Sequence, residues 1–136
     1  MTDSKRFKDR VVLISGAAGG FGSRTAERMA AEGARLVLSD LDETALAALA
    51  GRLDAPTAIL AGDVSHETLA EALVKLALER FGRLDIAINN AGIAQSFVRL
   101  PQIPAEEARR IIDIDLMGVF YAMKHQLPVL ERQNRE

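Results

Sequence analysis

The order of apolar and polar positions divides the chain into short apolar runs and longer segments with helical periodicity. The apolar runs occupy residues 10–15, 34–39, 57–61 and 84–88, and small or polar residues follow each of them. The apolar residues within a run are largely continuous rather than alternating, which is typical of strands buried on both faces of a parallel sheet. The pattern therefore predicts four parallel strands.

Helices are predicted between and after these strands, over residues 21–32, 42–53, 65–80 and 105–131. In the second and third of them, leucines recur at the spacing of one helical face. Gly33 and Gly82 stand where a glycine commonly ends a helix. Ser65 is placed to cap the third helix, and Pro104 suits the first turn of the last one.

Strict alternation of strand and helix predicts an α/β fold with helices on both faces of a parallel sheet. Right-handed crossovers then favour a doubly wound sheet of the Rossmann type, with strand order 3-2-1-4. With four strand–helix units the fold is incomplete. At 136 residues the chain is expected to form one domain, residues 1–136.

Composition excludes several functions. The net charge is −2, and acids and bases are mixed along the chain, so no basic stripe for nucleic acid or membrane is present. The chain has no cysteine, and its two histidines, His66 and His125, lack a flanking ligand pattern, so no metal site is expected. Neither a signal-peptide core nor an apolar run of about 18 residues occurs, and a cytoplasmic protein is expected.

A glycine turn follows the first strand, in the sequence Gly16-x-x-x-Gly20-Phe21-Gly22. Backbone N–H groups at the start of a helix point outward, and the helix dipole favours negative charge there. Glycine lets the backbone approach a pyrophosphate closely. Placed between a strand and a helix, this turn predicts a nucleotide-phosphate site.

Asp40 ends the second strand. A carboxylate at that position can accept hydrogen bonds from both hydroxyls of an adenosine ribose, and it would repel a 2′-phosphate. Because no Arg or Lys stands in the glycine turn or directly after Asp40, NAD is favoured over NADP. The alternative is that Asp40 caps the next helix, a role for which Asp42 is equally suited.

Two further motifs stand at the ends of the third and fourth strands. Asp63 and Val64 follow the third strand, where they could hold an adenine amino group or, in the simpler interpretation, cap the next helix. Asn89-Asn90-Ala91-Gly92 follows the fourth strand and suits a turn that passes close beneath a ligand, although such turns are common.

Together, the four motifs resemble the short-chain dehydrogenase/reductase (SDR) family, and Asp113–Phe120 is similar to its fourth-helix region. The resemblance covers about residues 8–133 and implies an NAD-dependent oxidoreductase that moves hydride between NAD and an alcohol or ketone. It implies cofactor contacts after each strand: the pyrophosphate at Gly16, Gly20, Phe21 and Gly22, the adenosine ribose at Asp40 and Leu41, the adenine at Asp63 and Val64, and the nicotinamide-side ribose at Asn90, Ala91 and Gly92.

Asp115 departs from the family pattern. The family usually carries an asparagine there, which is associated with a proton relay through ordered water to the catalytic lysine. Because Asp115 lies one helical turn from apolar residues, it is expected to be partly buried, with a raised pKa. Asp115 is therefore the candidate catalytic residue, as a proton relay, and a purely structural substitution is the alternative.

The resemblance also implies a catalytic serine and a Tyr-x-x-x-Lys motif on elements that would follow residue 136. Tyr121-Ala122-Met123-Lys124 has the wrong spacing and lies on an earlier helix, so it is interpreted as helix surface and packing. The chain is therefore expected to be the truncated cofactor-binding half of such an enzyme, inactive by itself.

Two alternatives remain open: a non-enzymatic NAD-binding module, and an S-adenosylmethionine-dependent methyltransferase, which also places glycines and an acid after its first two strands. The module would leave the fourth strand as an apolar open edge. The glycine spacing and the Asn-Asn-Ala-Gly turn argue against the methyltransferase. The partners are expected to be a small alcohol or carbonyl substrate of unknown identity and further copies of the chain, because the last helix carries surplus apolar surface.

Overall fold

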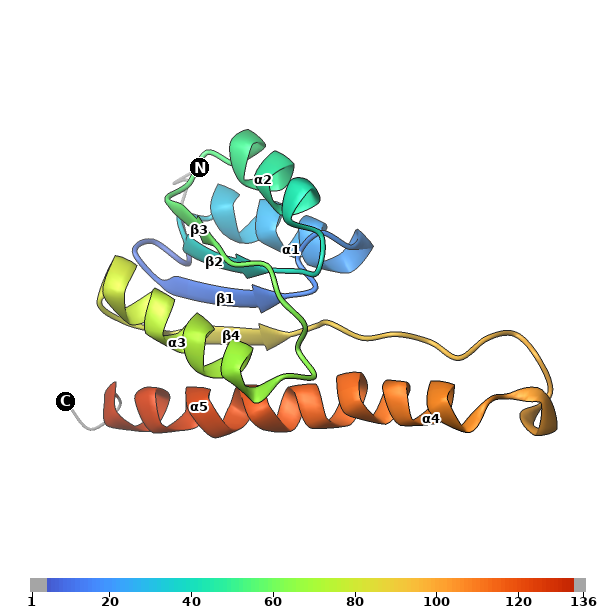
Figure 1. Ribbon diagram of the computed structural model, residues 1–136. Coiled ribbons are helices and arrows are strands. Elements are labelled where there is room, and N and C mark those ends of the chain that lie inside the picture. The colour runs from blue at the N-terminus through green and yellow to red at the C-terminus, as the bar shows by residue number, and fades with distance from the viewer. Residues whose placement is uncertain (1–4, 134–136) are drawn as a thin grey trace.

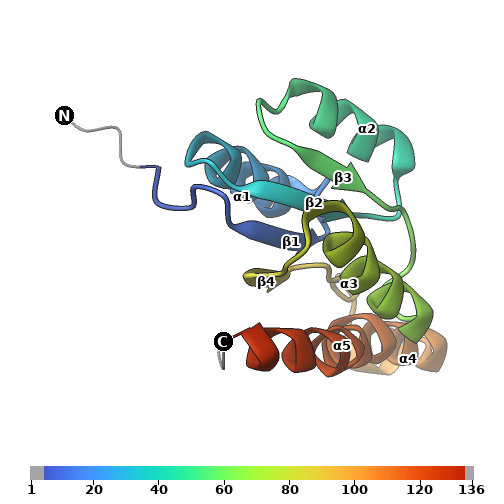
Figure 2. The ribbon, with the colours of Figure 1, turned by 90° about the vertical axis from the view of Figure 1, so that its left-hand side faces the viewer.

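The computed structural model describes residues 5–133, with strands and helices in strict alternation up to β4. Figures 1 and 2 show one layer of strands between two layers of helices. The strands are β1 (Val11–Ser15), β2 (Arg35–Ser39), β3 (Thr57–Ile59) and β4 (Ile86–Asn89), and the first three helices are α1 (Gly20–Ala31), α2 (Glu43–Arg52) and α3 (Glu67–Phe81).

The sheet confirms the predicted fold class. Its four strands are parallel and lie in the order β3-β2-β1-β4. In the register of the sheet, Val12 of β1 lies beside Leu36 of β2 on one side and Ile86 of β4 on the other. Since all four strands run the same way, their carboxyl ends meet at one edge.

Alternate residues of β1 serve two separate cores. Val12 and Ile14 pack with buried residues of α1 and α2, whereas Val11 and Leu13 pack with α3 and the last helix. β1 is buried along its whole length, which explains why its sequence is continuously apolar. Truncating Leu13, only 1% exposed, to alanine would cost about 2–5 kcal/mol.

The helix ends agree with the sequence at three positions and differ at one. Gly33 and Gly82 end α1 and α3 with left-handed φ angles of 92° and 75°. Asp42 caps α2 by accepting a hydrogen bond from the N–H of Ala45 at 3.0 Å. The prediction that Ser65 caps α3 is wrong: the helix begins at Glu67, and Ser65 instead donates to Asp63.

The predicted last helix is interrupted by a wide turn. It consists of α4 (Ala105–Ile111), the π-helical segment η2 (Ile112–Met117) and α5 (Gly118–Gln133). A π turn adds a residue to the helical repeat and so rotates the face that follows it. At Gly118 the helix comes so close to Val64 that an added Cβ would lie 3.0 Å from the Val64 side chain. Sequence periodicity alone does not reveal this interruption.

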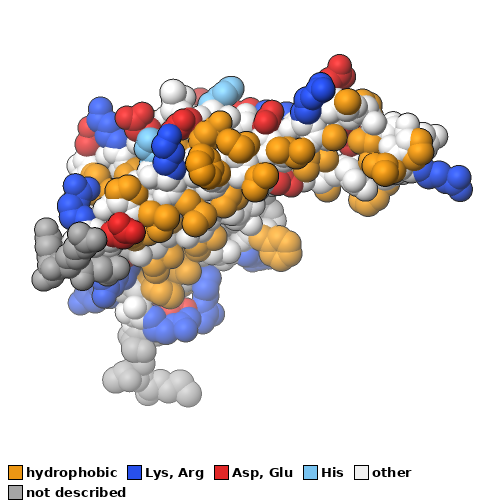
Figure 3. Space-filling model, turned by 90° about the horizontal axis from the view of Figure 1, so that it is seen from below, with side chains coloured by type: hydrophobic (Ala, Val, Ile, Leu, Met, Phe, Trp, Pro, Cys, Tyr) orange, Lys and Arg blue, Asp and Glu red, His pale blue; other side chains and the backbone are white. Residues whose placement is uncertain are grey.

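The loop after β4 and the helix α4 extend beyond the sheet (Figure 1). The loop contains a short 3-10 helix, η1 (Leu100–Gln102). Apolar side chains gather along the outer face of the last helix, as Figure 3 shows from below. Large exposed apolar residues of this outer stripe are Ile112, Leu116, Phe120, Met123 and Leu127. Within residues 5–133, no helix has the length and apolar character needed to cross a membrane.

Candidate functional site

A cleft with a volume of about 300 Å³ opens at the carboxyl edge of the sheet. Loops that follow all four strands contribute to its lining. All of the predicted cofactor residues except Gly22 line the cleft. Four further residues line it that the sequence does not predict: Gly19, Gly62, Ile93 and Ile114. The first three adjoin predicted cofactor residues, whereas Ile114 belongs to the last helix, which is distant in sequence.

The glycines of the turn have different roles. Gly16 has a φ angle of 63°, and a Cβ there would lie 2.8 Å from the Cα of Ala91. A Cβ on Gly22 would lie 2.0 Å from the carbonyl oxygen of Gly16. Gly20 has no atom within 4 Å of the place of its Cβ. Gly16 and Gly22 therefore allow the backbone to pack tightly, while Gly20 leaves open space at the cleft.

The N-terminus of α1 has the character of an anion site. Gly19 is the N-cap, no side chain caps the helix, and its first turn contains no acidic residue. The N–H of Ser23 donates to the carbonyl of Gly19 at 2.9 Å and the N–H of Gly19 to the carbonyl of Gly16 at 3.2 Å, so the N–H groups of residues 20–22 are the orphan donors of the helix start. These donors and the helix dipole fit a phosphate group.

Asp40 is bonded to the glycine turn. Its Oδ2 accepts a hydrogen bond from the N–H of Ala18 at 3.0 Å, and its Oδ1 accepts one from the N–H of Asp42 at 3.2 Å. The capping role considered for Asp40 belongs to Asp42, which is the N-cap of α2. The Asp40 carboxylate still has acceptor positions free for ligand hydroxyls.

Asp63 is held by Ser65 and by Arg110 of α4. Its Oδ1 accepts from the Ser65 N–H at 2.9 Å and the Ser65 hydroxyl at 2.7 Å, and its Oδ2 accepts from Arg110 at 2.7 Å. Burial acts to raise the pKa of Asp63, but the bonds from Ser65 and Arg110 outweigh it and lower the pKa to about 2. Asp63 is therefore ionised at neutral pH.

The Asn-Asn-Ala-Gly turn is tied to the end of β1. The side-chain amide of Asn90 donates to the carbonyls of Ser15 and Gly16 at 3.2 and 3.1 Å. In return, the hydroxyl oxygen of Ser15 accepts from the N–H groups of Asn90 and Ala91 at 3.1 and 3.2 Å. These bonds join the turn after β4 to the glycine turn. The role of Ser15 was not foreseen from the sequence.

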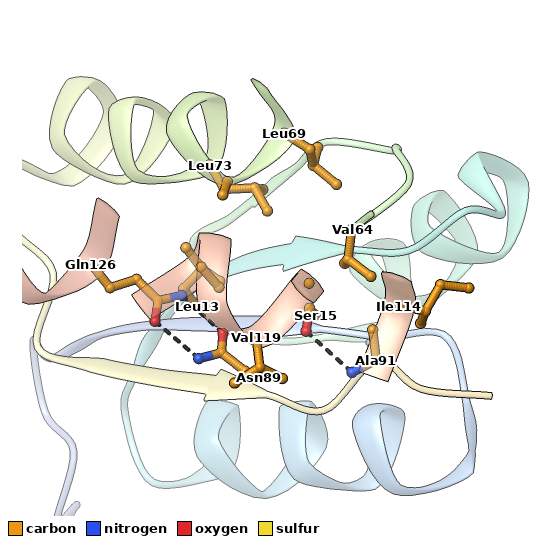
Figure 4. A pocket seen from close by; sticks show the side chains of 13 residues that line it. Leu13, Ser15, Val64, Leu69, Leu73, Asn89, Ala91, Ile114, Val119 and Gln126 are labelled. Atoms are coloured by element: carbon orange, nitrogen blue, oxygen red, sulfur yellow. Dashed lines mark hydrogen bonds between the residues drawn. The ribbon is translucent and has the colours of Figure 1, made fainter. Parts of the chain in front are cut away.

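A second, smaller cavity of about 20 Å³ lies behind the cleft, between β1, β4, α3 and α5 (Figure 4). It shares Val64, Ala91 and Ile114 with the cleft. Beside it, the side chains of Asn89 and Gln126 point toward one another and exchange hydrogen bonds of 3.0 and 2.9 Å. The two side-chain amides thereby satisfy each other's hydrogen-bonding groups inside an apolar region, and they link α5 to β4.

Asp115 is exposed, which corrects the expectation that it is partly buried. It lies in η2, and its Oδ1 accepts a hydrogen bond from the N–H of Ile93 at 2.9 Å. A Cβ on Gly92 would lie 3.3 Å from the same oxygen. The π turn places the side chain beside the loop after β4 rather than against the apolar core. Asp115 thus lies next to the cleft without lining it.

Tyr121 and Lys124 lie away from the cleft lining. Tyr121 packs edge to face on Phe120, with ring centres 5.9 Å apart. Lys124 donates to Glu67, at the start of α3, at 2.6 Å. Both side chains therefore have packing and surface contacts that account for their positions.

Comparison with known proteins identifies similar sequences over almost the whole chain. A family profile described as enoyl-(acyl carrier protein) reductase matches residues 16–135. The chain is 41% identical over 133 residues to levodione reductase of Leifsonia aquatica. The matched region covers 94% of this chain and 50% of that protein. It is 39% identical over 132 residues to a CLA biosynthesis dehydrogenase/reductase of Lactiplantibacillus plantarum, covering 95% and 46%. The chain spans about half the length of the curated relatives it matches.

Solved structures give the same result in three dimensions. The crystal structure of levodione reductase superposes with a TM-score of 0.90 at 40% identity, over 94% of this chain and 52% of that one. A short-chain dehydrogenase/reductase from Burkholderia phymatum in complex with NAD has a TM-score of 0.90 at 34% identity, over 94% and 46%.

Proposed function

Because the chain belongs to the short-chain dehydrogenase/reductase family, we propose that it is the cofactor-binding part of an NAD-dependent oxidoreductase. When bound, the nicotinamide supplies or accepts the hydride, and the protein binds and orients the cofactor. The substrate class is an alcohol or the corresponding carbonyl compound. The names of similar proteins, such as levodione reductase and cyclohexanol dehydrogenase, support this class without selecting one compound.

The position of Asp40 carries the proposal. It stands at the end of β2, lines the cleft and is bonded to the glycine turn through the N–H of Ala18. A dinucleotide with its pyrophosphate at the start of α1 would bring its adenosine ribose to this carboxylate. The cleft fits the group in a second respect, because Gly20 leaves open space where a side chain would meet the pyrophosphate.

NAD is proposed rather than NADP on the charge of the cleft. Asp40 and Asp63 line it, whereas no Arg or Lys occurs among the described residues of its lining. A 2′-phosphate beside Asp40 would meet a like charge without a cation to offset it, and that repulsion disfavours binding. Asp63 and Val64 are proposed for the adenine, and Asn90, Ala91 and Gly92 for the ribose near the nicotinamide.

Asp115 is proposed as a proton relay at the reaction end of the cleft. One carboxylate oxygen accepts the N–H of Ile93, and the other is free to accept a proton or a water. Tyr121 is the one tyrosine of the chain and does not line the cleft. We therefore propose that these 136 residues hold NAD but do not turn over an alcohol by themselves.

We further propose that copies of the chain associate through the outer stripe. Phe120, Met123 and Leu127 recur at intervals of three or four along α5, so they lie on one face of that helix, and Ile112 and Leu116 of η2 are exposed as well (Figure 3). Exposed apolar patches of this kind mark protein–protein contacts. Phe120→Glu should lower the sedimentation coefficient toward that of a single copy, whereas Lys75→Glu, on exposed α3 surface, should leave it unchanged.

Titration calorimetry with NAD, NADP and S-adenosylmethionine tests the function. We expect NAD to bind, NADP to bind more weakly and S-adenosylmethionine not to bind. Binding of S-adenosylmethionine alone would overturn the proposal in favour of a methyltransferase. Mass analysis of the natural product tests the remaining alternative: a natural chain of 14.7 kDa that binds NAD would favour a non-enzymatic module.

A further inference from the structure

Arg110 reaches from α4 to the loop that follows β3. Its Nη2 donates to Oδ2 of Asp63 at 2.7 Å, and its Nη1 donates to the hydroxyl oxygen of Ser65 at 3.1 Å. The guanidinium therefore spans the whole Asp63–Ser65 turn with two donors in a fixed plane. The Arg110 side chain is 44% exposed and that of Asp63 only 19%, so the bond lies at the rim of the cleft rather than in open solvent.

The hydrogen bonds of Asp63 leave little freedom to its carboxylate. A carboxylate offers about four acceptor positions, two on each oxygen. Ser65 occupies both positions on Oδ1 through its N–H and its hydroxyl, and Arg110 occupies one position on Oδ2. One position on Oδ2 is left for a donor from the cleft, such as the exocyclic amino group of an adenine.

We propose that Arg110 is a positioning residue of the cofactor site, which fixes the Asp63 carboxylate so that its remaining acceptor position serves the adenine end of the dinucleotide. The inference rests on the proposed NAD-binding function and adds a residue that does not line the cleft. Arg110 acts through Asp63 by a charge-assisted hydrogen bond, which is short and directional.

A purely structural role for Arg110 is the competing explanation, because the last helix contacts the same loop elsewhere. Gly118 packs on Val64, and Lys124 forms an ion pair with Glu67 at 2.6 Å. Lys124 therefore joins the last helix to the start of α3 much as Arg110 does, without touching Asp63. This gives a control: Lys124→Met removes an ion pair between α5 and α3, whereas Arg110→Met removes one between α4 and Asp63 in the preceding loop.

The test compares NAD affinities by calorimetry in a double-mutant cycle. Arg110→Met should weaken NAD about fivefold, and Lys124→Met should change it by less than about twofold. In an Asp63→Asn background, adding Arg110→Met should have less than about a twofold effect, because its target is gone. Arg110→Lys, which keeps the charge but loses the planar fork, should fall between wild type and Arg110→Met and covers the case in which the Met variant folds poorly.

Carbon-13 titration of the Asp63 carboxyl provides a readout that needs no ligand. The pKa of about 2 should rise in Arg110→Met and stay unchanged in Lys124→Met. The inference is overturned if both variants weaken NAD equally, if Arg110→Met keeps its full effect beside Asp63→Asn, or if the Asp63 pKa does not move. A wild-type protein that binds no NAD overturns the proposed function itself, and the inference with it.

Discussion

The Asp40 carboxylate accepts a hydrogen bond from the N–H of Ala18 at 3.0 Å, so the end of β2 is bonded directly to the turn that follows β1. This one contact joins the two parts of the cleft proposed for the ribose and the pyrophosphate. Asp40 therefore holds the glycine turn in addition to its proposed contact with the ribose, and its replacement should affect both.

The first prediction concerns the choice of cofactor. Asp40→Ala combined with Leu41→Arg should weaken NAD at least about tenfold, since hydrogen bonds to a charged group contribute about 1.5–3 kcal/mol. NADP should become favoured relative to NAD, because the carboxylate is replaced by a cation suited to a 2′-phosphate. Calorimetry with both nucleotides measures the change. Asp40→Asn is the control that retains the acceptor for Ala18, and an unchanged NAD affinity in the double variant would contradict the ribose assignment.

The second prediction concerns the packing of the glycine turn. Gly22→Ala places a Cβ 2.0 Å from the carbonyl oxygen of Gly16, so the turn must shift, and the free energy of unfolding should fall by about 2 kcal/mol or more. Gly51→Ala, inside α2 with no atom within 4 Å of the new Cβ, should instead raise it by about 0.5–1 kcal/mol. Urea denaturation compares the two. Equal behaviour would show that Gly22 is not needed for close packing.

The third prediction concerns acid stability. The pKa of Asp63 is about 2 in the folded chain, below its ordinary value of 3.8, so its ionised form stabilises the fold. That stabilisation is fully present above about pH 4 and is lost as the pH falls through 2. The urea midpoint should therefore drop over this range, and it should drop less in Asp63→Asn, which has no carboxylate to protonate. Identical acid profiles for the two proteins would contradict the lowered pKa.

The fourth prediction concerns the amide pair between β4 and α5. Gln126 is 4% exposed and exchanges two hydrogen bonds with Asn89. Gln126→Ala leaves the Asn89 amide without its partner and should lower the free energy of unfolding by about 1–3 kcal/mol. Replacing both residues by alanine should lower the free energy of unfolding by less than the sum of the two single changes, because each single variant leaves the other amide without a hydrogen-bond partner. Additive costs in chemical denaturation would show that the pair is not coupled.

Much of the fold could be predicted because a strand that is buried on both faces has a continuous run of apolar residues in its own sequence. The apolar runs around Leu13 and Val37 are continuous because both faces of those strands are covered, and parallel strands then bring their following residues to one edge. The contacts of Asp63 with Arg110 could not be predicted in this way, because 47 positions separate the two residues in sequence. The π turn at 112–117 has no counterpart in the helical periodicity either, and Gly118, directly after it, lies close to Val64 in a distant loop.

Asp115 shows the same limit, and it gives the fifth prediction. Helical periodicity alone places it near apolar neighbours, whereas the π turn leaves it exposed and bonded to the N–H of Ile93. Asp115→Asn keeps an acceptor for that N–H and should retain the protection of the Ile93 amide against hydrogen exchange. Asp115→Ala removes the acceptor, so the amide should exchange faster and the free energy of unfolding should fall by about 1 kcal/mol.

Comparing these two variants separates the two roles of the Asp115 side chain. The carboxyl group is lost in both, but the bond to Ile93 is lost only in Asp115→Ala. If Asp115 relays protons, the pH dependence of hydride transfer in the active enzyme should change in Asp115→Asn, although its Ile93 amide remains protected. An unchanged pH profile in Asp115→Asn would show that the relay does not depend on titration of the carboxyl group, and an unchanged rate of hydride transfer in Asp115→Ala would contradict the relay.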